Sequence, residues 1–336
     1  MLQKKQIIGP MNEKLLLTTI SKSEMKVHDL SGEEHTIRVK YHKAYINGEQ
    51  HVRKGKRTKE MHKEPNYFVK SYFSMDCDCT PIATHEHSII SMLNHPGIVK
   101  SFGTTSSNTE NDRGIIKDVF GAAYSARIFL EYIPGPNLTH YISSNTLETN
   151  EKIRIIKELT NIFQYMTEQK IIYADYKPEN IMINKDGSGI NYAGMMVKLV
   201  DFEISIIRPT VYDAPEGQEH RYGTKLYITP ERTTEPTGKK IPRISEASEV
   251  QSLARVFFQL ITGQKANMPD THLKHKEIYT LISQGNTGAL YLKQRKTLKG
   301  QLKDHKELAD LIHRSLDARY DQRPSVDEFC KTIRDI

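Results

Sequence analysis

The hydrophobic pattern of this 336-residue sequence changes character at Pro134-Gly135-Pro136. Before this point, runs of β-branched and aromatic residues predict strands at 35–52, 67–73 and 127–133, with a helix at 85–93. After it, apolar residues recur at helical spacing, first in the stripe of Ile153, Ile156, Leu159, Ile162, Phe163 and Met166. Strands followed by helices, rather than alternating with them, predict an α+β chain of two lobes joined by a short connector.

We expect three parts within these lobes. Residues 1–66 would hold an N-terminal extension and the first strands of the small lobe, 67–133 the rest of that lobe with the connector, and 134–336 the helical lobe. In the first part, Asn47-Gly48 suits the positive φ angles of a tight hairpin.

Basic residues gather in two stretches of a chain whose net charge is +7. The first, at 53–63, contains Arg53, Lys54, Lys56, Arg57, Lys59 and Lys63. A solvated loop is the simpler interpretation, and an acidic or phosphate-bearing activator bound there is the alternative. The second, at 293–306, is expected to be a solvent-facing connector before a helix at Glu307. Neither has the signature of a nucleic-acid-binding module, so a nucleic acid is not an expected partner.

Membrane, export and disulfide signals are weak throughout. The longest apolar runs are too short to cross a bilayer, and the N-terminus lacks the apolar segment and cleavage site of a Sec signal peptide. These features favour a cytoplasmic location, or secretion into a host cell by another route. The three cysteines, Cys77, Cys79 and Cys330, do not form a disulfide framework. Cys77 and Cys79 also lack zinc-site spacing relative to His85 and His87.

The segment YADYKPENI, at 173–181, has the residue types that phosphoryl transfer requires. Such a reaction needs a carboxylate to orient the attacking hydroxyl, a cation to offset charge on the transferring group, and an amide oxygen to hold Mg²⁺. Asp175, Lys177 and Asn180 supply these three groups in that order.

The segment VKLVDFEI, at 197–204, places Asp201 at the end of an apolar strand. A carboxylate at a strand end can bind a metal ion, although an ordinary aspartate after a buried strand would explain the segment equally well if it stood alone. Its position after YADYKPENI favours the metal-binding interpretation.

Taken in order, these motifs resemble the eukaryotic-type protein kinase family from about Tyr67 to the C-terminus. The resemblance implies a bilobal protein-kinase-like fold, with a strand-rich N-lobe containing one regulatory helix and a larger helical C-lobe. It also implies ATP and Mg²⁺ or Mn²⁺ as cofactors. Lys70 is similar to the strand lysine that grips the α- and β-phosphates, and Glu86 is similar to the helix glutamate that pairs with it.

The resemblance extends to the nucleotide and metal sites. Leu130 is similar to the gatekeeper residue of the hinge, with the backbones of Glu131 and Ile133 facing the adenine. Asp175 is similar to the catalytic base, while Asn180 and Asp201 are similar to the two metal ligands.

The segment GTKLYITPE, at 223–231, resembles the end of an activation segment. By this resemblance Thr224 would hydrogen-bond Asp175 and Lys177, and Glu231 would pair with Arg323. These residues would build a platform for a protein substrate, and Lys177 favours transfer to serine or threonine over tyrosine.

The sequence departs from the family pattern at several positions. GxGxxG is absent before Lys70, and Gly48 is the candidate residue for covering the phosphates. Tyr173 and Ala174 replace the customary His and Arg; because that Arg clamps a phosphorylated activation segment, such a switch is not expected here. Glu203 replaces the glycine after Asp201-Phe202, and Glu249 stands where the central helix normally has Asp.

These departures leave two alternatives to a serine/threonine protein kinase. A catalytically weak pseudokinase could act as a scaffold or allosteric partner, and a small-molecule kinase of similar fold could share the metal site. The retained residues favour an enzyme, and GTKLYITPE with Arg323 favours a protein substrate. A divergent kinase with a basic extension is similar to secreted bacterial effector or viral kinases.

Overall fold

The computed structural model divides the chain into two compact units, Met1–Asn94 with Ile98–Pro134, and His95–Gly97 with Gly135–Ile336. The structure describes residues 5–8, 14–19, 24–28, 34–46, 49–53, 67–74, 80–107, 124–184, 196–208, 227, 229, 244–264, 288–317 and 319–336. None of the described helices combines the length and the apolarity that crossing a bilayer requires.

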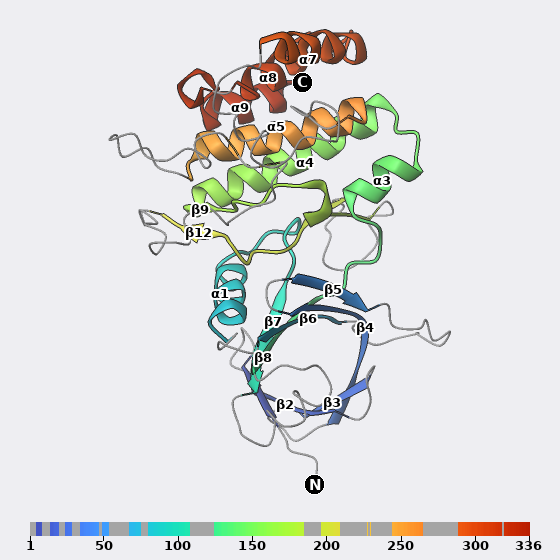
Figure 1. Cartoon of the computed structure of the whole chain (residues 1–336), viewed down its shortest axis with the longest axis vertical. Coiled ribbons are helices and arrows are strands. Elements are labelled where there is room, and N and C mark those ends of the chain that lie inside the picture. The colour runs from blue at the N-terminus through green and yellow to red at the C-terminus, as the bar shows by residue number, and fades with distance from the viewer. Residues whose placement is uncertain are drawn as a thin grey trace. The chain divides into compact units, whose positions relative to one another are not determined.

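The first unit is built on an eight-stranded sheet, counted over the described residues. Its strands are β1 (Lys5–Ile8), β2 (Lys14–Thr19), β3 (Glu24–His28), β4 (Glu34–Ile46), β5 (Glu49–Arg53), β6 (Tyr67–Ser74), β7 (Ser101–Ser107) and β8 (Tyr124–Glu131). The spatial order is β1-β2-β3-β4-β6-β8-β7, and β5 pairs with β4 outside this path (Figure 1). The N-terminal segment therefore adds strands to the same sheet that carries Lys70.

The predicted hairpin is confirmed by antiparallel pairing of β4 with β5, in which Ile46 lies opposite Glu49. Asn47 and Gly48 themselves lie outside the described residues, as does the basic run beyond Arg53. Strand β4 pairs in parallel with β6, and this register sets Lys43 beside Lys70. The hairpin thus extends from a strand that lies directly beside the lysine strand.

Helix α1 (Thr80–Ser91) buries Ala83, Glu86, Ile89 and Ile90, which lie at helical spacing on one face. This face packs against β7 and β8. The prediction of a helix here is confirmed, but its bounds of 85–93 were wrong because the helix begins at Thr80-Pro81. Proline fits the first turn of a helix, where its missing N–H has no partner to lose.

The second unit contains the helices α3 (Leu138–Ser144), α4 (Thr149–Glu168), α5 (Glu246–Thr262), α7 (Gly288–Gln301), α8 (Lys306–Ser315) and α9 (Val326–Asp335). Two short antiparallel sheets accompany them: β9 (Ile171–Ile172) with β12 (Ile206–Ile207), and β10 (Ile181–Ile183) with β11 (Val197–Leu199). The 3-10 turns η1 (Pro178–Asn180) and η3 (Tyr320–Gln322) complete the described elements. The expected connector at 293–306 was wrong, because most of it belongs to α7.

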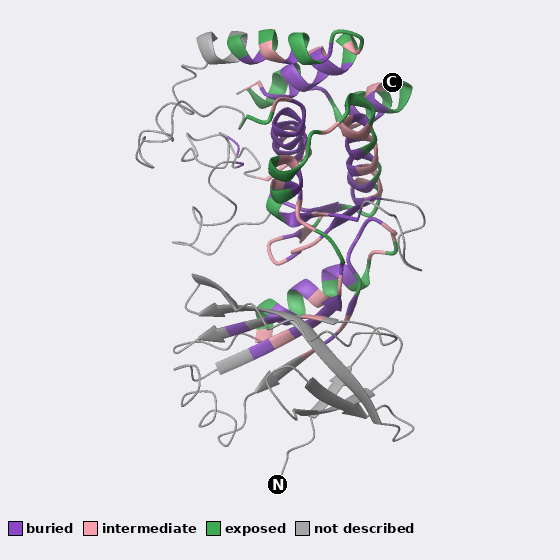
Figure 2. Ribbon diagram, turned by 90° about the vertical axis from the view of Figure 1, so that its right-hand side faces the viewer, coloured by how far each residue is buried: buried purple, intermediate pink, exposed green. Residues whose placement is uncertain are grey.

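Helix α5 forms the core of this unit, because every residue from Ser248 to Ile261 is buried. Its ends are well defined. Ser245 caps the N-terminus by accepting the backbone N–H of Ser248, and Gly263 ends the helix at φ +71°. In Figure 2 the helices of this unit carry their buried residues inward and their exposed residues outward. A fully buried central helix gives a rigid base for the polar side chains on its first turn.

Gly135 begins the second unit in a conformation that suits glycine alone. Its φ is +143°, and a Cβ atom there would lie 2.0 Å from the carbonyl oxygen of Ile183. The next residue, Pro136, contacts β10 as well, since its carbonyl accepts the N–H of Ile183 at 2.9 Å. The segment after Pro134 is thus fixed to β10 by its backbone.

We predict that Gly135→Ala lowers the free energy of unfolding by about 2–4 kcal/mol, through backbone strain and the contact with Ile183. Gly300→Ala is the matched control: it lies in α7 with nothing within 4 Å of its Cβ, and it should raise stability by about 0.5–1 kcal/mol. Urea unfolding followed by circular dichroism measures both changes. Equal midpoints for Gly135→Ala and the parent chain would contradict the prediction.

Candidate active site

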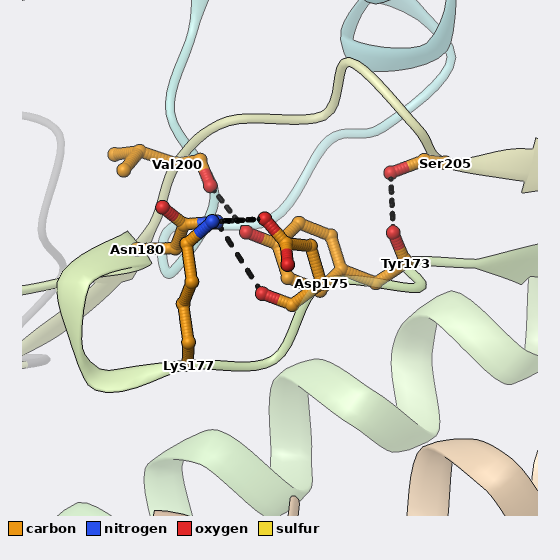
Figure 3. A network of polar contacts seen from close by, with 6 residues as sticks. All are labelled: Tyr173, Asp175, Lys177, Asn180, Val200 and Ser205. Atoms are coloured by element: carbon orange, nitrogen blue, oxygen red, sulfur yellow. Dashed lines mark hydrogen bonds and ion pairs between the residues drawn. The ribbon is translucent and has the colours of Figure 1, made fainter. Parts of the chain in front are cut away.

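The loop between β9 and β10 holds the three polar residues that the sequence singled out. Lys177 makes an ion pair with Oδ2 of Asp175, and Asn180 Nδ2 donates to the same oxygen at 2.9 Å. Asn180 Nδ2 also reaches the backbone carbonyl of Asp175 at 3.3 Å. Figure 3 shows the three side chains converging. The structure therefore brings Asp175, Lys177 and Asn180 together as one hydrogen-bonded group with the Asp175 carboxylate at its centre.

Glu249, on the first turn of α5, holds this loop in place through hydrogen bonds to its backbone. Its carboxylate accepts the backbone N–H of Tyr173 at 2.9 Å and that of Ala174 at 3.1 and 3.2 Å. Ala174 needs this support because its φ is +69°, a conformation that costs a non-glycine residue about 1–3 kcal/mol. Glu249, which stands where the family pattern has an aspartate, thus connects α5 to the loop between β9 and β10.

Tyr173 connects this loop to the segment that carries Asp201. Its hydroxyl donates to the carbonyl of Val200, the residue before Asp201, and its own carbonyl accepts the hydroxyl of Ser205 at 2.9 Å (Figure 3). Its ring lies edge-on to Phe202, with ring centroids 5.0 Å apart. The side chain thus contacts the residues on both sides of Asp201.

The protonation state of Tyr173 suits this role. Burial raises the pKa of Tyr173 well above its usual value, and the nearby charges of Asp175 and Asp201 raise it further. The hydroxyl therefore keeps its proton and remains a hydrogen-bond donor at any physiological pH.

Asn180 and Asp201 come from segments joined at the backbone, since the N–H of Val200 donates to the carbonyl of Asn180 at 3.0 Å. Asp201 has φ +71°, a second left-handed non-glycine residue in the site. Asn180 is buried and turns its amide nitrogen toward Asp175, so its amide oxygen is the atom that would face a cation. A carboxylate and an amide oxygen are donors that Mg²⁺ accepts, and the residues present fit such an ion.

The first unit holds the residues predicted to bind phosphate. Lys70 Nζ lies 2.9 Å from Oε2 of Glu86, with both side chains at most 2% exposed. Tyr72 donates its hydroxyl to the same Oε2 at 2.7 Å. Because side chains alternate along a strand, Tyr72 lies on the same face of β6 as Lys70. This spacing is the signal by which the sequence could have identified Tyr72, which the motif analysis missed.

Leu130 and Glu131, two of the residues predicted to form the hinge, end strand β8, and Ile133 follows it. Leu130 and Ile133 are buried. Glu131 is joined to Lys100 twice: its N–H donates to the Lys100 carbonyl at 2.8 Å, and its carboxylate accepts the Lys100 N–H at 3.2 Å. These bonds fix the backbone path of the segment whose groups the resemblance assigns to adenine.

The expected platform residues are only partly described. Arg323 is buried and ties the segment before α9 to the rest of the unit, donating to the carbonyls of Asp317 at 2.8 Å and Ala247 at 2.9 Å. Thr224, Glu231 and Gly48 lie outside the described residues, as do Cys77 and Cys79. The predicted pairs that involve Thr224 and Glu231 stay predictions.

Two buried tyrosines in the loop between β9 and β10 differ in one respect. The hydroxyl of Tyr173 is bonded to Val200, whereas the hydroxyl of Tyr176 has no hydrogen-bond partner within the described part of the chain. We predict that Tyr173→Phe lowers the free energy of unfolding by about 1–2 kcal/mol, because the Val200 carbonyl loses its donor.

Tyr176→Phe is the matched control, and it should be neutral or stabilising by up to about 1 kcal/mol because it removes an unpaired buried hydroxyl. Thermal and urea unfolding of both variants measure the difference. A greater loss in Tyr176→Phe than in Tyr173→Phe would refute the assignment.

A double-mutant cycle tests the Lys70–Glu86 pair. Lys70→Met and Glu86→Gln should each cost about 3–5 kcal/mol, since either change leaves a buried polar group without its partner. The double variant should cost clearly less than the sum, because no charge then stays unpaired. Urea unfolding of the four proteins gives the coupling energy, and additive costs would show that the two side chains do not interact.

Comparison with known proteins extends the description beyond this geometry. A model described as the protein kinase domain matches residues 54–333. The chain is 31% identical over 191 residues to the serine/threonine-protein kinase tousled-like 2 of Xenopus tropicalis, a match covering 54% of this chain and 24% of the relative. It is 31% identical over 189 residues to tousled-like 1 of Homo sapiens, covering 54% and 22%.

A bacterial relative gives a similar result. The chain is 26% identical over 180 residues to the serine/threonine-protein kinase PknB of Mycolicibacterium smegmatis, covering 53% of this chain and 25% of the relative. The matches thus span a quarter or less of the length of these curated relatives. The domain match, in contrast, covers most of the chain, and with relatives of this kind the chain belongs to the eukaryotic-type serine/threonine protein kinase family.

Proposed function

We propose that the chain is an ATP-dependent protein kinase that transfers the γ-phosphate of ATP to serine or threonine hydroxyls of a protein substrate. The observation that carries the proposal is the arrangement of Asp175, whose carboxylate is joined to both Lys177 and Asn180. A carboxylate held in this way can orient a hydroxyl and accept its proton as the oxygen attacks phosphorus. The bond between the γ-phosphorus and its bridging oxygen then breaks, which releases ADP.

The other site residues supply binding and charge. Lys70, held by Glu86, would contact the α- and β-phosphates, while Leu130 and the backbones of Glu131 and Ile133 would line the adenine site. Lys177 would offset negative charge on the transferred group. Asn180 and Asp201 would hold Mg²⁺ or Mn²⁺, which when bound neutralises charge on the phosphates. The names of the matched relatives and the residue Lys177 support serine or threonine as the acceptor.

A pseudokinase is the second candidate, and specific substitutions favour it. Ala174 removes the usual arginine, Glu203 replaces a glycine in the metal-ligand segment, and no GxGxxG precedes Lys70. Against it, the complete polar group around Asp175 is assembled, and two left-handed residues, Ala174 and Asp201, are kept in strained conformations. Strain of this kind persists where the surrounding structure enforces it, which occurs often at active sites.

The deciding experiment measures transfer of labelled γ-phosphate to a generic basic protein by the purified chain with Mg²⁺ or Mn²⁺. Asp175→Asn should lower the rate by about 10²–10⁴-fold, because the general base is lost. Asp201→Asn should lower the rate as well. It should also abolish the further rise in the unfolding temperature of the chain that the metal ion causes when it is added together with ATP. Asp335→Asn, at the exposed end of α9, is the control and should change neither quantity.

Each outcome separates the candidates. Label on serine or threonine that both site variants lose supports the protein kinase. ATP binding without transfer supports the pseudokinase, and transfer that survives Asp175→Asn would remove Asp175 from its proposed role.

A further inference from the structure

Helix α7 presents four exposed cations on one side. Lys293, Arg295, Lys296 and Lys299 are exposed, and the helix contains no acidic residue; these four residues are called the basic face below. The opposite side of α7 is buried through Gln294 and Leu298, which packs the helix against α5 and α8. Figure 2 shows α7 at one end of the unit, with exposed residues outward and buried residues inward. The packing of Gln294 and Leu298 against the rest of the unit therefore fixes the direction in which the basic face points.

The charge of the basic face is poorly balanced. Asp310 of α8 lies 3.5 Å from Arg295 and 3.3 Å from Lys299, so one carboxylate serves two cations. Lys293 and Lys296 have no ion-pair partner among the residues that the structure describes. Lys303, in the turn that follows, and Lys306, the first residue of α8, are also exposed and extend the positive region. Asp310 shows how a carboxylate sits on this face, between cations one helical turn apart.

We propose that the basic face of α7 binds an acidic segment of the protein substrate, away from the site of phosphate transfer. The inference deepens the proposed function and rests on it. Carboxylates of such a segment would bind Lys293 and Lys296 as Asp310 binds Arg295 and Lys299. Because α7 and the catalytic loop belong to the same compact unit, a segment held on α7 is held at a fixed place relative to Asp175.

The chemistry of the face fits a peptide better than other polyanions. Single-stranded nucleic acids bind through aromatic stacking as well as charge, and none of the four residues of the basic face is aromatic. An interfacial membrane helix inserts an apolar face, whereas Leu298, on the side of α7 opposite the basic face, is buried within the protein. Asp304 and Glu307 flank the lysines of the turn and would repel a duplex with one charge per about 1.7 Å. A peptide can avoid them by spacing its carboxylates.

A docking site of this kind has a definite kinetic signature. Tethering a substrate raises its effective concentration near the catalytic loop without changing the chemical step. Removal of the docking charge should therefore raise KM for substrates with an acidic segment and leave kcat unchanged. Substrates without such a segment should not respond.

The binding experiment uses the full chain and a fluorescein-labelled peptide in which glutamate alternates with serine, followed by anisotropy. Lys293→Glu/Lys296→Glu should weaken binding by roughly tenfold or more, since two attractions become repulsions. Lys170→Glu/Lys331→Glu, with the same change in net charge at two other exposed lysines, should weaken it less than about threefold. The peptide with glutamine in place of glutamate should bind none of the three proteins, the parent chain included.

Two further arms make the result decisive. A duplex DNA and phosphatidylserine vesicles are titrated in parallel, and dependence on Lys293 and Lys296 for either of these, but not for the peptide, would overturn the proposal. Equal losses in the two double variants would overturn it as well, because only net charge would then matter.

The kinetic experiment separates this inference from the proposed function. A basic substrate peptide is compared with the same peptide joined to the glutamate-serine segment. For the parent chain, KM should be lower for the longer peptide than for the basic peptide alone. Lys293→Glu/Lys296→Glu should remove this difference in KM and leave kcat unchanged on both peptides. Absence of transfer by the parent chain would refute the kinase activity, while the anisotropy result would still decide whether the basic face binds acidic peptides.

Discussion

The buried carboxylate of Glu249 is the interaction on which the rest of the site depends. Placing a charge in a protein interior is costly unless it is fully hydrogen-bonded, and here the backbone N–H groups of Tyr173 and Ala174 satisfy it. Those same bonds hold Ala174 in its left-handed conformation. The loop then turns so that Asp175 points toward Lys177 and Asn180. A single glutamate thus links the most buried helix of the unit to the proposed chemistry.

Tyr173 connects the loop that carries Asp175 to the segment that carries Asp201. A tyrosine has both a ring and a hydroxyl, so it can pack on Phe202 while bonding the carbonyl of Val200. The two segments are also joined by the backbone bond between Val200 and Asn180. The position of Asp201 is consequently determined by contacts of its two neighbours, Val200 and Phe202.

Much of this arrangement could be predicted from the sequence, because motif spacing reports on chemistry directly. The order of Asp175, Lys177, Asn180 and Asp201 was sufficient to propose a phosphoryl-transfer site, and the Asn47-Gly48 dipeptide marked the β4–β5 hairpin. The helical stripe beginning at Ile153 gave α4. Each of these signals lies within a short stretch of sequence, so it can be recognised without knowledge of the tertiary structure.

Other features depend on contacts between distant segments and could not be predicted. The bonds from Glu249 to Tyr173 and Ala174 span about 75 residues of chain. The stretch at 293–306 was interpreted as a connector because its apolar residues are few, and hydropathy gave no helical signal. In the structure Leu298 is buried and α7 packs against α5 and α8. Amphipathic helices whose polar face is very large are easily taken for loops.

The shared hydrogen bonds at Glu86 have a consequence for conformational selectivity. Both Lys70 and Tyr72 bond the same carboxylate oxygen, so any state in which Glu86 turns away from β6 must break two interactions at once. The populated fraction of such a state falls exponentially as that combined cost rises, and the apparent affinity of a ligand that requires the state is reduced by that fraction. The chain is therefore expected to favour ligands that bind while Glu86 of α1 stays bonded to Lys70 and Tyr72 of β6.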